Sequence, residues 1–418
     1  MTVAVGLADA ATALARCDEL AALSARPGRI DRFSWTTEHA AANRLVGAWL
    51  DAAGMAAWQD AAGNVCGRLE GARPGLPALV LGSHLDTVPD AGRYDGPLGV
   101  VVALAVAARL RAFAPQLPFA LEVVGFTDEE GTRFGTALTG SRAFAGAWDD
   151  ALLEVADGDG ITIRAACEAF GLDPGQINRA ARPAGSLIGY LEVHIEQGVR
   201  LEEAGRPLGV VRSIAGARRL HLAVLGEARH AGGTPYDRRR DALVGASHAV
   251  LDVARLASVA GCIATVGQLT AHPGAFNVVP GRVEMSLDLR AERNEARDRL
   301  WEDVRDAVVA RCTGLGLRLV VEEVHIASAQ ECAPELRELL ARGVQAATRS
   351  SEEPPELLSW AGHDAMAVAR IAPVGMLFVR CADGISHAPA EHVTGSDVAL
   401  AIDALEAAVL DLAERRAR

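Results

Sequence analysis

The sequence contains no lysine, so all 41 basic residues among its 418 are arginine. Without a lysine amine, the chain cannot form a Schiff base with a carbonyl substrate or with pyridoxal phosphate. A P-loop that ends in Gly-Lys-Ser/Thr and the strand lysine of protein kinases are excluded for the same reason. The chemistry of this protein therefore depends on other side chains.

Aromatic residues and paired cysteines are also scarce. Only 4% of the residues are aromatic, so Ala, Val and Leu must fill the core of what is otherwise a globular composition. The seven cysteines are scattered without a Cys-x-x-Cys pair, which is typical of a reduced, cytoplasmic protein. The first residues lack a basic start, and the most apolar run, 98–108, is too short to span a bilayer. We therefore expect neither a secretion signal nor a transit peptide, and no membrane span.

Acidic residues outnumber basic residues in this chain. The chain has 41 basic and 54 acidic residues, so its formal net charge is 41 − 54 = −13. Nucleic acids and anionic membranes attract basic surfaces. The charge balance therefore argues against either as the main partner.

Short apolar runs alternate with helical patterns in the first and last parts of the chain. Buried strands are predicted at 76–81, 121–126, 191–195 and 376–379, and helices at 36–53, 98–113, 333–347 and 395–415. Between these parts, 219–224 and 282–289 alternate with period two, and helices are predicted at about 240–258 and 294–313. The pattern predicts an α/β domain formed by 1–212 and 329–418, interrupted by an inserted α+β domain at 213–328.

Four segments place polar side chains where the pattern predicts strand ends, which is where α/β sheets build their sites. They are Gly82–Thr87 followed by Tyr94–Gly96, Thr127–Gly131, Glu192–Gly198 and Gly384–His387. Together they hold histidines and several carboxylates, a ligand set that suits borderline divalent metals such as Zn²⁺ or Mn²⁺. Since a lone histidine or an adjacent Glu-Glu pair is usually structural, only the combination of four segments favours a dinuclear metal hydrolase.

Two of these segments suggest roles beyond metal binding. A carboxylate beside a metal ligand can act as general base on the attacking water, and the Glu129-Glu130 pair fits that division of labour. Asp86 follows His84 by two residues, so its carboxylate is expected on the same side and could hold the imidazole tautomer. Spacing alone does not identify the substrate.

Seven segments together resemble the N-carbamoyl-L-amino-acid hydrolase and allantoate amidohydrolase family, which belongs to the co-catalytic metallopeptidases and deacylases. They are Gly82–Asp95, Glu129–Gly135, Glu192–Gly198, His230–Pro235, Asn277–Pro280, Gly362–Ala365 and Gly384–His387. They occur in the family's order over nearly the whole chain. The resemblance implies a central mixed sheet flanked by helices, with the inserted domain as a lid that also forms a homodimer interface.

Carried over residue by residue, the resemblance implies two divalent metal ions per subunit. One would be bound by His84, Asp95 and His194, and the other by Asp95, Glu130 and His387, with Asp95 as the bridge. Glu129 corresponds to the general base. These ligand types do not distinguish Zn from Mn, Co or Ni.

The resemblance also implies substrate-binding residues in the inserted domain. Arg290 resembles the arginine that clamps the substrate carboxylate, with Asn277 beside it and Arg218 as a weaker candidate. His230 resembles the lid histidine that stabilises the oxyanion, in its own or in the partner subunit. From the residues alone, a strand-end salt bridge for Arg290 and turn positions for His230 and Asn277 are the simpler readings.

Gln197 and His363 match polar positions of the same pocket, whereas two positions depart from the family's motifs. Arg229 stands before His230, and Trp360 precedes Ala361-Gly362, where the family has glycine. Both side chains are large enough to reshape the pocket.

The segments Gly131–Ala137 and Met376–Cys381 look most like allantoate amidohydrolases, so we expect a small ureide carboxylate as substrate. The expected reaction converts allantoate to ureidoglycine, ammonia and carbon dioxide, and N-carbamoyl-L-amino acids or N-carbamoyl-β-alanine are the alternatives. A metal-free binding protein on this scaffold is a rival interpretation. Such a protein is expected to have lost one or more of the five implied metal ligands and Glu129, and all six residues are present here. An aminopeptidase would need a pocket for a free amine, which the resemblance does not support.

Overall fold

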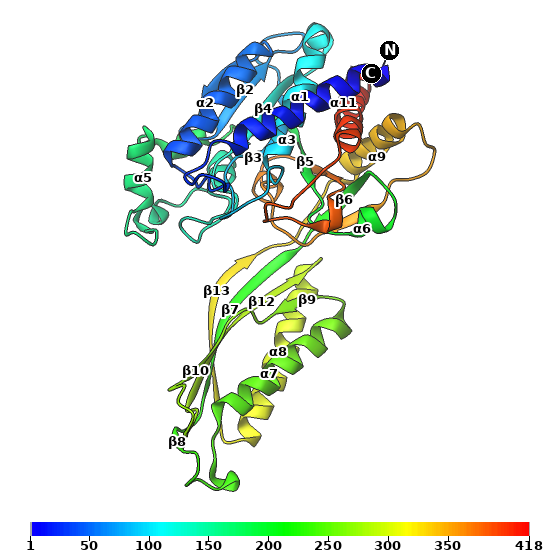
Figure 1. The fold of residues 1–418 in the computed structure, drawn as a ribbon. Coiled ribbons are helices and arrows are strands. Elements are labelled where there is room, and N and C mark those ends of the chain that lie inside the picture. Colours follow the sequence, from blue (N-terminus) through cyan, green and yellow to red (C-terminus); the bar gives the residue numbers. More distant parts are fainter. Residues whose placement is uncertain (1, 418) are drawn as a thin grey trace. The chain divides into compact units, whose positions relative to one another are not determined.

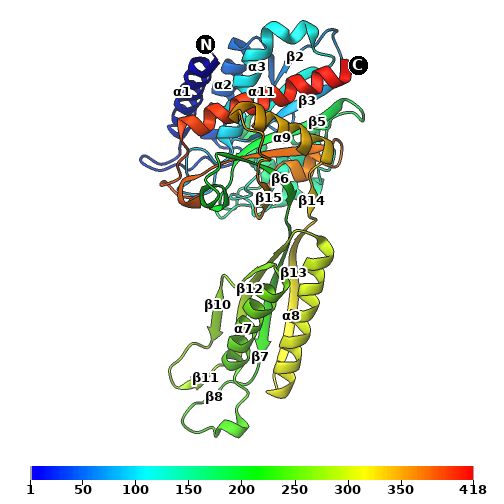
Figure 2. The same cartoon turned by 90° about the vertical axis from the view of Figure 1, so that its right-hand side faces the viewer.

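The computed structural model describes residues 2–417 and divides them into two compact units (Figures 1 and 2). Unit 1 contains the described residues up to Arg212 together with Cys332–Leu357 and the chain from Gly362 onward. Unit 2 contains Ser213–Glu331 and the short piece Leu358–Ala361. The sequence patterns place the boundaries after residues 212 and 328, whereas the compact units change over after residues 212 and 331.

Unit 1 is built on a mixed sheet with nine strands among the described residues. Its order is β1 (Ala56–Gln59), β2 (Val65–Leu69), β4 (Ala120–Phe126), β3 (Ala78–His84), β5 (Leu187–Ile195), β16 (Val374–Val379), β6 (Leu208–Ile214) and β14 (Gln330–Glu331), and β15 (Glu356–Ser359) also pairs with β6. The strands β4, β3, β5 and β16 are mutually parallel, and β1, β2, β6 and β14 pair antiparallel. The predicted α/β class with a mixed central sheet is confirmed.

Helices flank this sheet. They are α1 (Thr2–Ala21), α2 (Thr37–Ala52), α3 (Pro97–Leu110), α4 (Thr139–Phe144), α5 (Ile163–Phe170), α6 (Arg200–Glu203), α9 (Pro334–Thr348), α10 (Ala365–Val368) and α11 (Gly395–Ala417), with 3₁₀ turns η1 (Arg111–Gln116), η2 (Asp150–Glu154), η3 (Pro174–Ala180) and η5 (Ala382–Gly384). A single core cluster joins α1, α2, α3, α9 and α11 to the sheet, and Ala, Val and Leu make up most of it. The low aromatic content is thus compatible with a large core.

Local chemistry explains where the helices begin and end. The hydroxyl of Thr36 accepts a hydrogen bond from the backbone N–H of His39 at 3.3 Å and caps the start of α2, and Gly54 follows the end of α2 with φ 82°. Pro97 opens α3, a position at which its missing N–H is not needed. Nearly every face of α3 is apolar. This fits its position, because other helices and the central sheet bury most of its residues.

The parallel strands explain why distant polar segments meet. Since β4, β3, β5 and β16 are neighbours and run in one direction, their carboxyl ends gather at one edge of the sheet. One strand end differs from the prediction. β3 continues to His84, beyond the predicted end at residue 81, whereas β5 ends at Ile195 as predicted.

Unit 2 pairs an antiparallel sheet with two long helices. The sheet order is β10 (Leu269–His272), β12 (Arg282–Ala291), β7 (Gly216–Leu225) and β13 (Arg318–Ala327), with β9 (Ile263–Thr265) also beside β12. Helices α7 (Ala242–Ala260) and α8 (Asn294–Gly314) share a core cluster with β7 and β12. At one end of the unit, β8 (Arg229–His230) pairs with β11 (Val278–Val279), and η4 (Tyr236–Arg238) follows.

Among residues 2–417, two helical stretches are long and apolar enough to cross a membrane by length and composition alone. One is Pro97–Gln116, nine residues longer than the 98–108 run noted in the sequence, and 67% of its apolar window is buried in unit 1. The other is α7, which packs one face into the core of unit 2. Such helices are weak evidence for a membrane span, because core helices have the same length and composition.

Candidate metal centre

Asp95 lies at the centre of the polar side chains gathered at the sheet edge. Its Oδ1 atom lies 3.2 Å from His194 Nε2 and 3.5 Å from His84 Nε2, and its Oδ2 atom lies 3.1 Å from His387 Nε2. His387 Nε2 is in turn 3.5 Å from Glu130 Oε1. The two triads predicted from the resemblance, His84/Asp95/His194 and Asp95/Glu130/His387, are each brought together with their candidate ligand atoms within 4.8 Å of one another.

The imidazoles of the first triad are oriented by backbone carbonyls. His84 Nδ1 lies 3.0 Å from the carbonyl oxygen of Asp86, and His194 Nδ1 lies 2.9 Å from that of Ile195. With Nδ1–H donating to these carbonyls, each Nε2 faces Asp95 and can offer its lone pair to a cation once its proton is lost. This donor set of imidazole and carboxylate fits a borderline divalent cation.

Glycine allows the close approach of Asp95 to His84. Gly96 has φ 82°, and a Cβ atom there would lie 2.5 Å from the His84 ring. Only glycine therefore fits between Asp95 and helix α3, which begins beside it.

Burial opposes the charge on Asp95, but hydrogen bonds from His194, His387 and His84 outweigh it and hold the pKa of Asp95 well below its ordinary value. The same contact with Asp95 raises the pKa of His387 to about 9. A buried carboxylate that stays ionised among three imidazole nitrogens is arranged to bind cations.

Glu129 and Glu130 follow β4 in a strained turn. Asp128 before them has φ 61°, and its carboxylate accepts hydrogen bonds from the hydroxyls of Ser34 (2.6 Å) and Thr139 (2.8 Å). Burial raises the pKa of Glu129 well above its usual range and, together with nearby Asp95, raises that of Glu130 to about 7. Glu129 therefore holds a proton more readily than an ordinary glutamate does.

The carboxylate of Asp86 has a different task from the predicted one. The backbone carbonyl of Asp86, and not its carboxylate, orients the His84 ring. The nearest carboxylate oxygen of Asp86 is 3.8 Å from His84 Nδ1. Instead, Asp86 Oδ1 and Oδ2 accept the backbone N–H groups of Glu129 (3.0 Å) and Glu130 (3.2 Å). Asp86 thus ties the β3 end to the β4 turn and fixes the two glutamates.

Other polar side chains surround the triads. Gln197, with φ 54°, donates from Nε2 to Asp95 Oδ2 at 2.9 Å and lies 3.2 Å from His387 Nε2. His363 packs against His194 with ring centroids 4.5 Å apart, and burial lowers its pKa well below the usual value. Both side chains therefore contact candidate metal ligands.

Three residues at this edge were not singled out from the sequence. Glu192 accepts hydrogen bonds from Ser83 Oγ (2.9 Å) and from the backbone N–H of Ala365 (3.3 Å). Ser386 and Glu391 form hydrogen bonds around Asp95. Glu391 lies in a loop with no metal-ligand spacing, so no sequence pattern points to it.

In unit 2, His230 and Asn277 lie together at the β8–β11 end. His230 pairs with Val278, and the backbone N–H of Ala231 donates to the carbonyl of Asn277 at 2.8 Å. His230 Nδ1 accepts the backbone N–H of Gly233 at 3.0 Å. Both side chains are exposed, and neighbouring Arg229 forms an ion pair with Glu227.

Arg290 and Arg218 lie in the five-stranded sheet of unit 2, at the end away from β8 and β11, where Arg290 pairs with Ala217 and Leu289 with Arg218. Asn277 therefore does not lie beside Arg290 in the same chain, as the resemblance implied. Arg290 donates to both carboxylate oxygens of Asp288 (2.9 and 3.3 Å) and to the carbonyl of Trp360 (2.6 Å). Arg218 forms ion pairs with Glu323 (2.7 Å) and Asp298 (3.4 Å). In this structure Arg290 therefore forms the salt bridge that the sequence left open as the simpler alternative.

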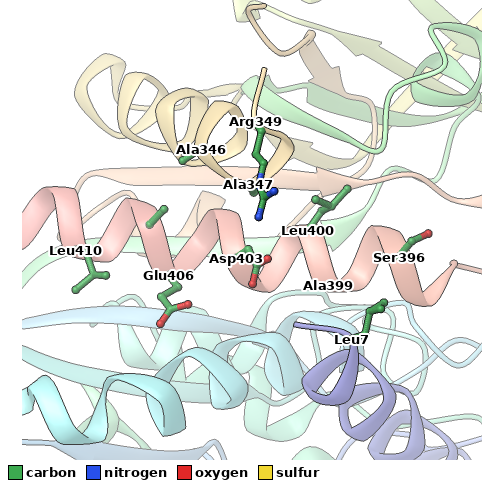
Figure 3. Close-up of a pocket in the computed structure, with 11 residues that line it drawn as sticks. Leu7, Ala346, Ala347, Arg349, Ser396, Ala399, Leu400, Asp403, Glu406 and Leu410 are labelled. Carbon is green, nitrogen blue, oxygen red and sulfur yellow. The ribbon is translucent and has the colours of Figure 1, made fainter. Parts of the chain in front are cut away.

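A separate cavity of about 600 Å³ lies between α1, α9 and α11 (Figure 3). Alanine and leucine form most of its wall, and Arg349, Asp403 and Glu406 supply its charges. Asp403 and Glu406 both bind Arg109, at 2.8 and 2.6 Å. None of its described lining residues is a candidate metal ligand, so we assign no role in the chemistry to this cavity.

Comparison with known proteins places the chain in a family. The pattern of peptidase family M20/M25/M40 matches residues 80–411, which is 411 − 79 = 332 of the 418 residues. The matched region includes every candidate metal ligand.

Curated relatives are similar over nearly the whole chain. An N-carbamoyl-L-amino acid amidohydrolase of Geobacillus stearothermophilus is 40% identical, with 96% of this chain and 97% of the relative covered. An allantoate deiminase of Arabidopsis thaliana is 37% identical, with 93% of this chain and 80% of the relative covered.

Solved structures are also similar over nearly the whole chain. An amidase of the hydantoinase/carbamoylase family from Burkholderia multivorans superposes with a TM-score of 0.86 at 33% identity, covering 97% of this chain and 98% of the other. A structure described as AtUAH in complex with glyoxylate superposes with a TM-score of 0.80 at 30% identity, also covering 97% and 98%.

Proposed function

Since the chain belongs to peptidase family M20/M25/M40, within its hydantoinase/carbamoylase amidases, we propose that it hydrolyses the ureido group of a small carboxylate at a dinuclear metal site. Membership makes it an amidohydrolase that acts on C–N bonds, of the carbamoylase and allantoate amidohydrolase type. The observation that carries the proposal is that Asp95 belongs to both triads and that buried Glu129 and partly buried Glu130 lie beside it.

We assign His84, Asp95 and His194 to one metal ion and Asp95, Glu130 and His387 to the other, with Zn or Mn as the first candidates and Co or Ni as alternatives. When bound, two such ions supply Lewis acidity that activates water and polarises the ureido carbonyl. Asp86 and Asp128 hold the turn that presents the glutamates. Gln197 donates a hydrogen bond to Asp95 Oδ2 and helps to hold that carboxylate in place.

Glu129 performs the proton transfers. It takes a proton as water adds to the ureido carbon and passes that proton to the nitrogen as the C–N bond breaks. The products are the amine and a carbamate, which decomposes to ammonia and carbon dioxide. Glu129 is placed for this shuttle, because its side chain is buried beside the two triads and Asp86 holds its backbone.

The proposed substrate is allantoate, converted to ureidoglycine, and the second candidate is an N-carbamoyl-L-amino acid. The 37% identical allantoate deiminase supports the first choice, and the 40% identical N-carbamoyl-L-amino acid amidohydrolase supports the second. The structure with glyoxylate supports a pocket for a small carboxylate, because that ligand carries one. Arg290 is proposed to clamp this carboxylate after exchanging its contact with Asp288.

An ammonia-release assay on the metal-loaded protein tests the substrate. It compares allantoate, N-carbamoyl-L-amino acids and N-carbamoyl-β-alanine at equal concentrations. We expect the highest kcat/KM for allantoate. A higher value for an N-carbamoyl-L-amino acid would select the second candidate, and no ammonia from any of the three would contradict the ureidase proposal.

The distance between His230 and Arg290 supports a homodimer. Arg290 lies eight residues along β12 from Arg282, about 26 Å of extended strand, and the β8–β11 pair that carries His230 lies beyond the Arg282 end. Figure 2 shows β8 and β11 at one end of unit 2. A small ureide cannot touch both residues of one chain. If both act on it, one of them comes from a second copy.

The outer strand of unit 2 supplies a surface for that second copy. Strand β13 is ten residues long and pairs with β7 on one side, which leaves it at the edge of the sheet order. Its apolar side chains Val324 and Ile326 are 53% and 50% exposed. Long apolar edges favour pairing with another strand, so we propose that unit 2 forms the dimer interface.

A complementation experiment tests this arrangement. His230→Ala and Arg290→Ala should each lose most ureidase activity, Arg290→Ala through a raised KM for the carboxylate-bearing substrate. If His230 acts in the partner's site, subunits mixed after dissociation should regain about one quarter of the wild-type activity, because half of the dimers then contain one intact site. No recovery in a mixture shown to contain hybrid dimers would contradict action across the dimer, and an unchanged KM would remove Arg290 from the site.

A further inference from the structure

Glu391 is a buried carboxylate, 4% exposed, in the loop between β16 and α11. Its Oε1 atom accepts two backbone N–H groups, those of Tyr94 (2.7 Å) and Asp95 (3.1 Å). Its Oε2 atom lies 3.1 Å from Ser386 Oγ. The side chain thus joins the segment that carries the bridging aspartate to the segment that carries His387.

Ser386 completes this connection. Its hydroxyl lies 2.7 Å from Asp95 Oδ2 and receives a hydrogen bond from Gln197 Nε2 at 3.2 Å. Oδ2 is also the Asp95 oxygen that faces His387 Nε2 at 3.1 Å. Glu391 therefore fixes the backbone of Asp95, and Ser386 fixes the Oδ2 atom of Asp95.

The space around Glu391 is closely fitted. A Cβ atom at Gly92 would lie 2.2 Å from the carboxylate carbon of Glu391. Both carboxylate oxygens are engaged by neighbouring protein groups, so this residue is placed as a brace and not as a metal ligand. Nothing in the sequence pattern distinguishes it, because it follows His387 by four residues in an irregular loop.

We propose that Glu391 is a positioning residue that sets Asp95 and His387 for the second metal ion. The inference rests on the dinuclear site proposed above. It assigns no contact between Glu391 and substrate or metal. Glu391 acts through the Asp95 backbone and through Ser386.

The effect should be selective for one of the two sites. His84 and His194 are oriented by the carbonyls of Asp86 and Ile195, which lie in their own segments and do not depend on Glu391. His387 has φ 57° and follows Ser386 directly, so its place depends on the braced loop. Removing the brace therefore weakens the Asp95/Glu130/His387 site more than the His84/Asp95/His194 site.

The test is a metal titration of the full-length protein with Mn²⁺, followed by equilibrium dialysis and by electron paramagnetic resonance. Two ions bridged by a carboxylate give an exchange-coupled signal, and a single ion gives an isolated six-line signal. For Glu391→Ala we expect the second binding constant to weaken by about 10- to 100-fold, with the first nearly unchanged. The coupled signal should be lost at metal concentrations that saturate the wild type.

Two further variants separate positioning from a general loss of structure. Glu391→Gln keeps an oxygen for the two N–H groups, and its amide can donate to Ser386, so it should bind both ions as the wild type does. Ser386→Ala removes only the hydroxyl beside Asp95 Oδ2 and should weaken the second ion. This smaller change tests the connection even if Glu391→Ala does not fold.

Asp157→Ala is the matched control. Asp157 Oδ1 also accepts two backbone N–H groups, those of Asp159 and Ile161 (both 3.0 Å), and its Oδ2 accepts Arg133 Nε at 2.9 Å. Its loop carries no proposed ligand, so both ions should be retained. Wild-type binding of the second ion by Glu391→Ala, or equal weakening of both ions, would overturn the inference. A wild type that binds one ion would instead overturn the dinuclear site itself.

Discussion

Asp95→Ala should lose both metal ions and reduce ammonia release by at least about 1,000-fold, because two ions that each stabilise transition-state charge by several kcal/mol share this carboxylate. Its two oxygens lie 3.1–3.5 Å from three different imidazole nitrogens. Alanine would leave those imidazoles facing one another with no anion between them. The measurement is metal content per chain by mass spectrometry together with the rate of ammonia release.

His387→Ala is the graded comparison for this prediction. It removes a ligand of the second ion alone, so it should keep one ion per chain where Asp95→Ala keeps none. Circular dichroism establishes that each variant is folded. Two retained ions in folded Asp95→Ala would contradict the bridging role.

Glu129→Gln should lower kcat by about 100- to 10,000-fold, the contribution typical of a general acid–base residue. Glutamine keeps the size of this 8% exposed side chain but cannot accept the proton of the attacking water. Metal content should stay at the wild-type value, since Glu129 is not among the five ligand residues proposed. The measurement is kcat under saturating substrate, with metal content determined on the same sample.

The neighbouring glutamate provides the control. Glu130→Gln should lose affinity for the second ion, because Glu130 Oε1 lies 3.5 Å from His387 Nε2. The backbone of both residues is held by the same Asp86 carboxylate, so the two variants differ mainly in the side chain removed. Full activity in Glu129→Gln would make the base assignment wrong. Loss of metal in Glu129→Gln with retention in Glu130→Gln would exchange the two roles.

Much of unit 1 could be predicted because its signals are local. Apolar runs mark β3, β4, β5 and β16, and parallel neighbours must bring their carboxyl ends to one edge. The histidines and acids that follow those runs therefore had to meet. The resemblance to a known family then ordered them into two triads, and the structure brings the members of each triad together.

The parts that could not be predicted depend on backbone atoms and on irregular loops. The residue spacing placed Asp86 near His84, but the turn presents its carbonyl to the imidazole and its carboxylate to Glu129. Glu391 has no spacing signal, since its partners are backbone N–H groups nearly 300 positions away.

The sequence also could not separate the ends of unit 2. Arg290 and His230 are both attributed to one pocket by the resemblance, yet the register of β12 with β7 places Arg290 opposite Ala217, far from the β8–β11 end. Strand register is set by many weak contacts along both strands, and no single residue reveals it. Their roles in substrate binding remain proposals.

The most direct test of the dinuclear ureidase is a titration of the metal-free wild-type protein with Mn²⁺ while ammonia release from allantoate and from N-carbamoyl-L-amino acids is followed. We expect binding of two equivalents per chain, with ureidase activity rising to its maximum as the second equivalent binds. Full activity without added metal in the presence of a chelator, or saturation below one equivalent per chain, would contradict it.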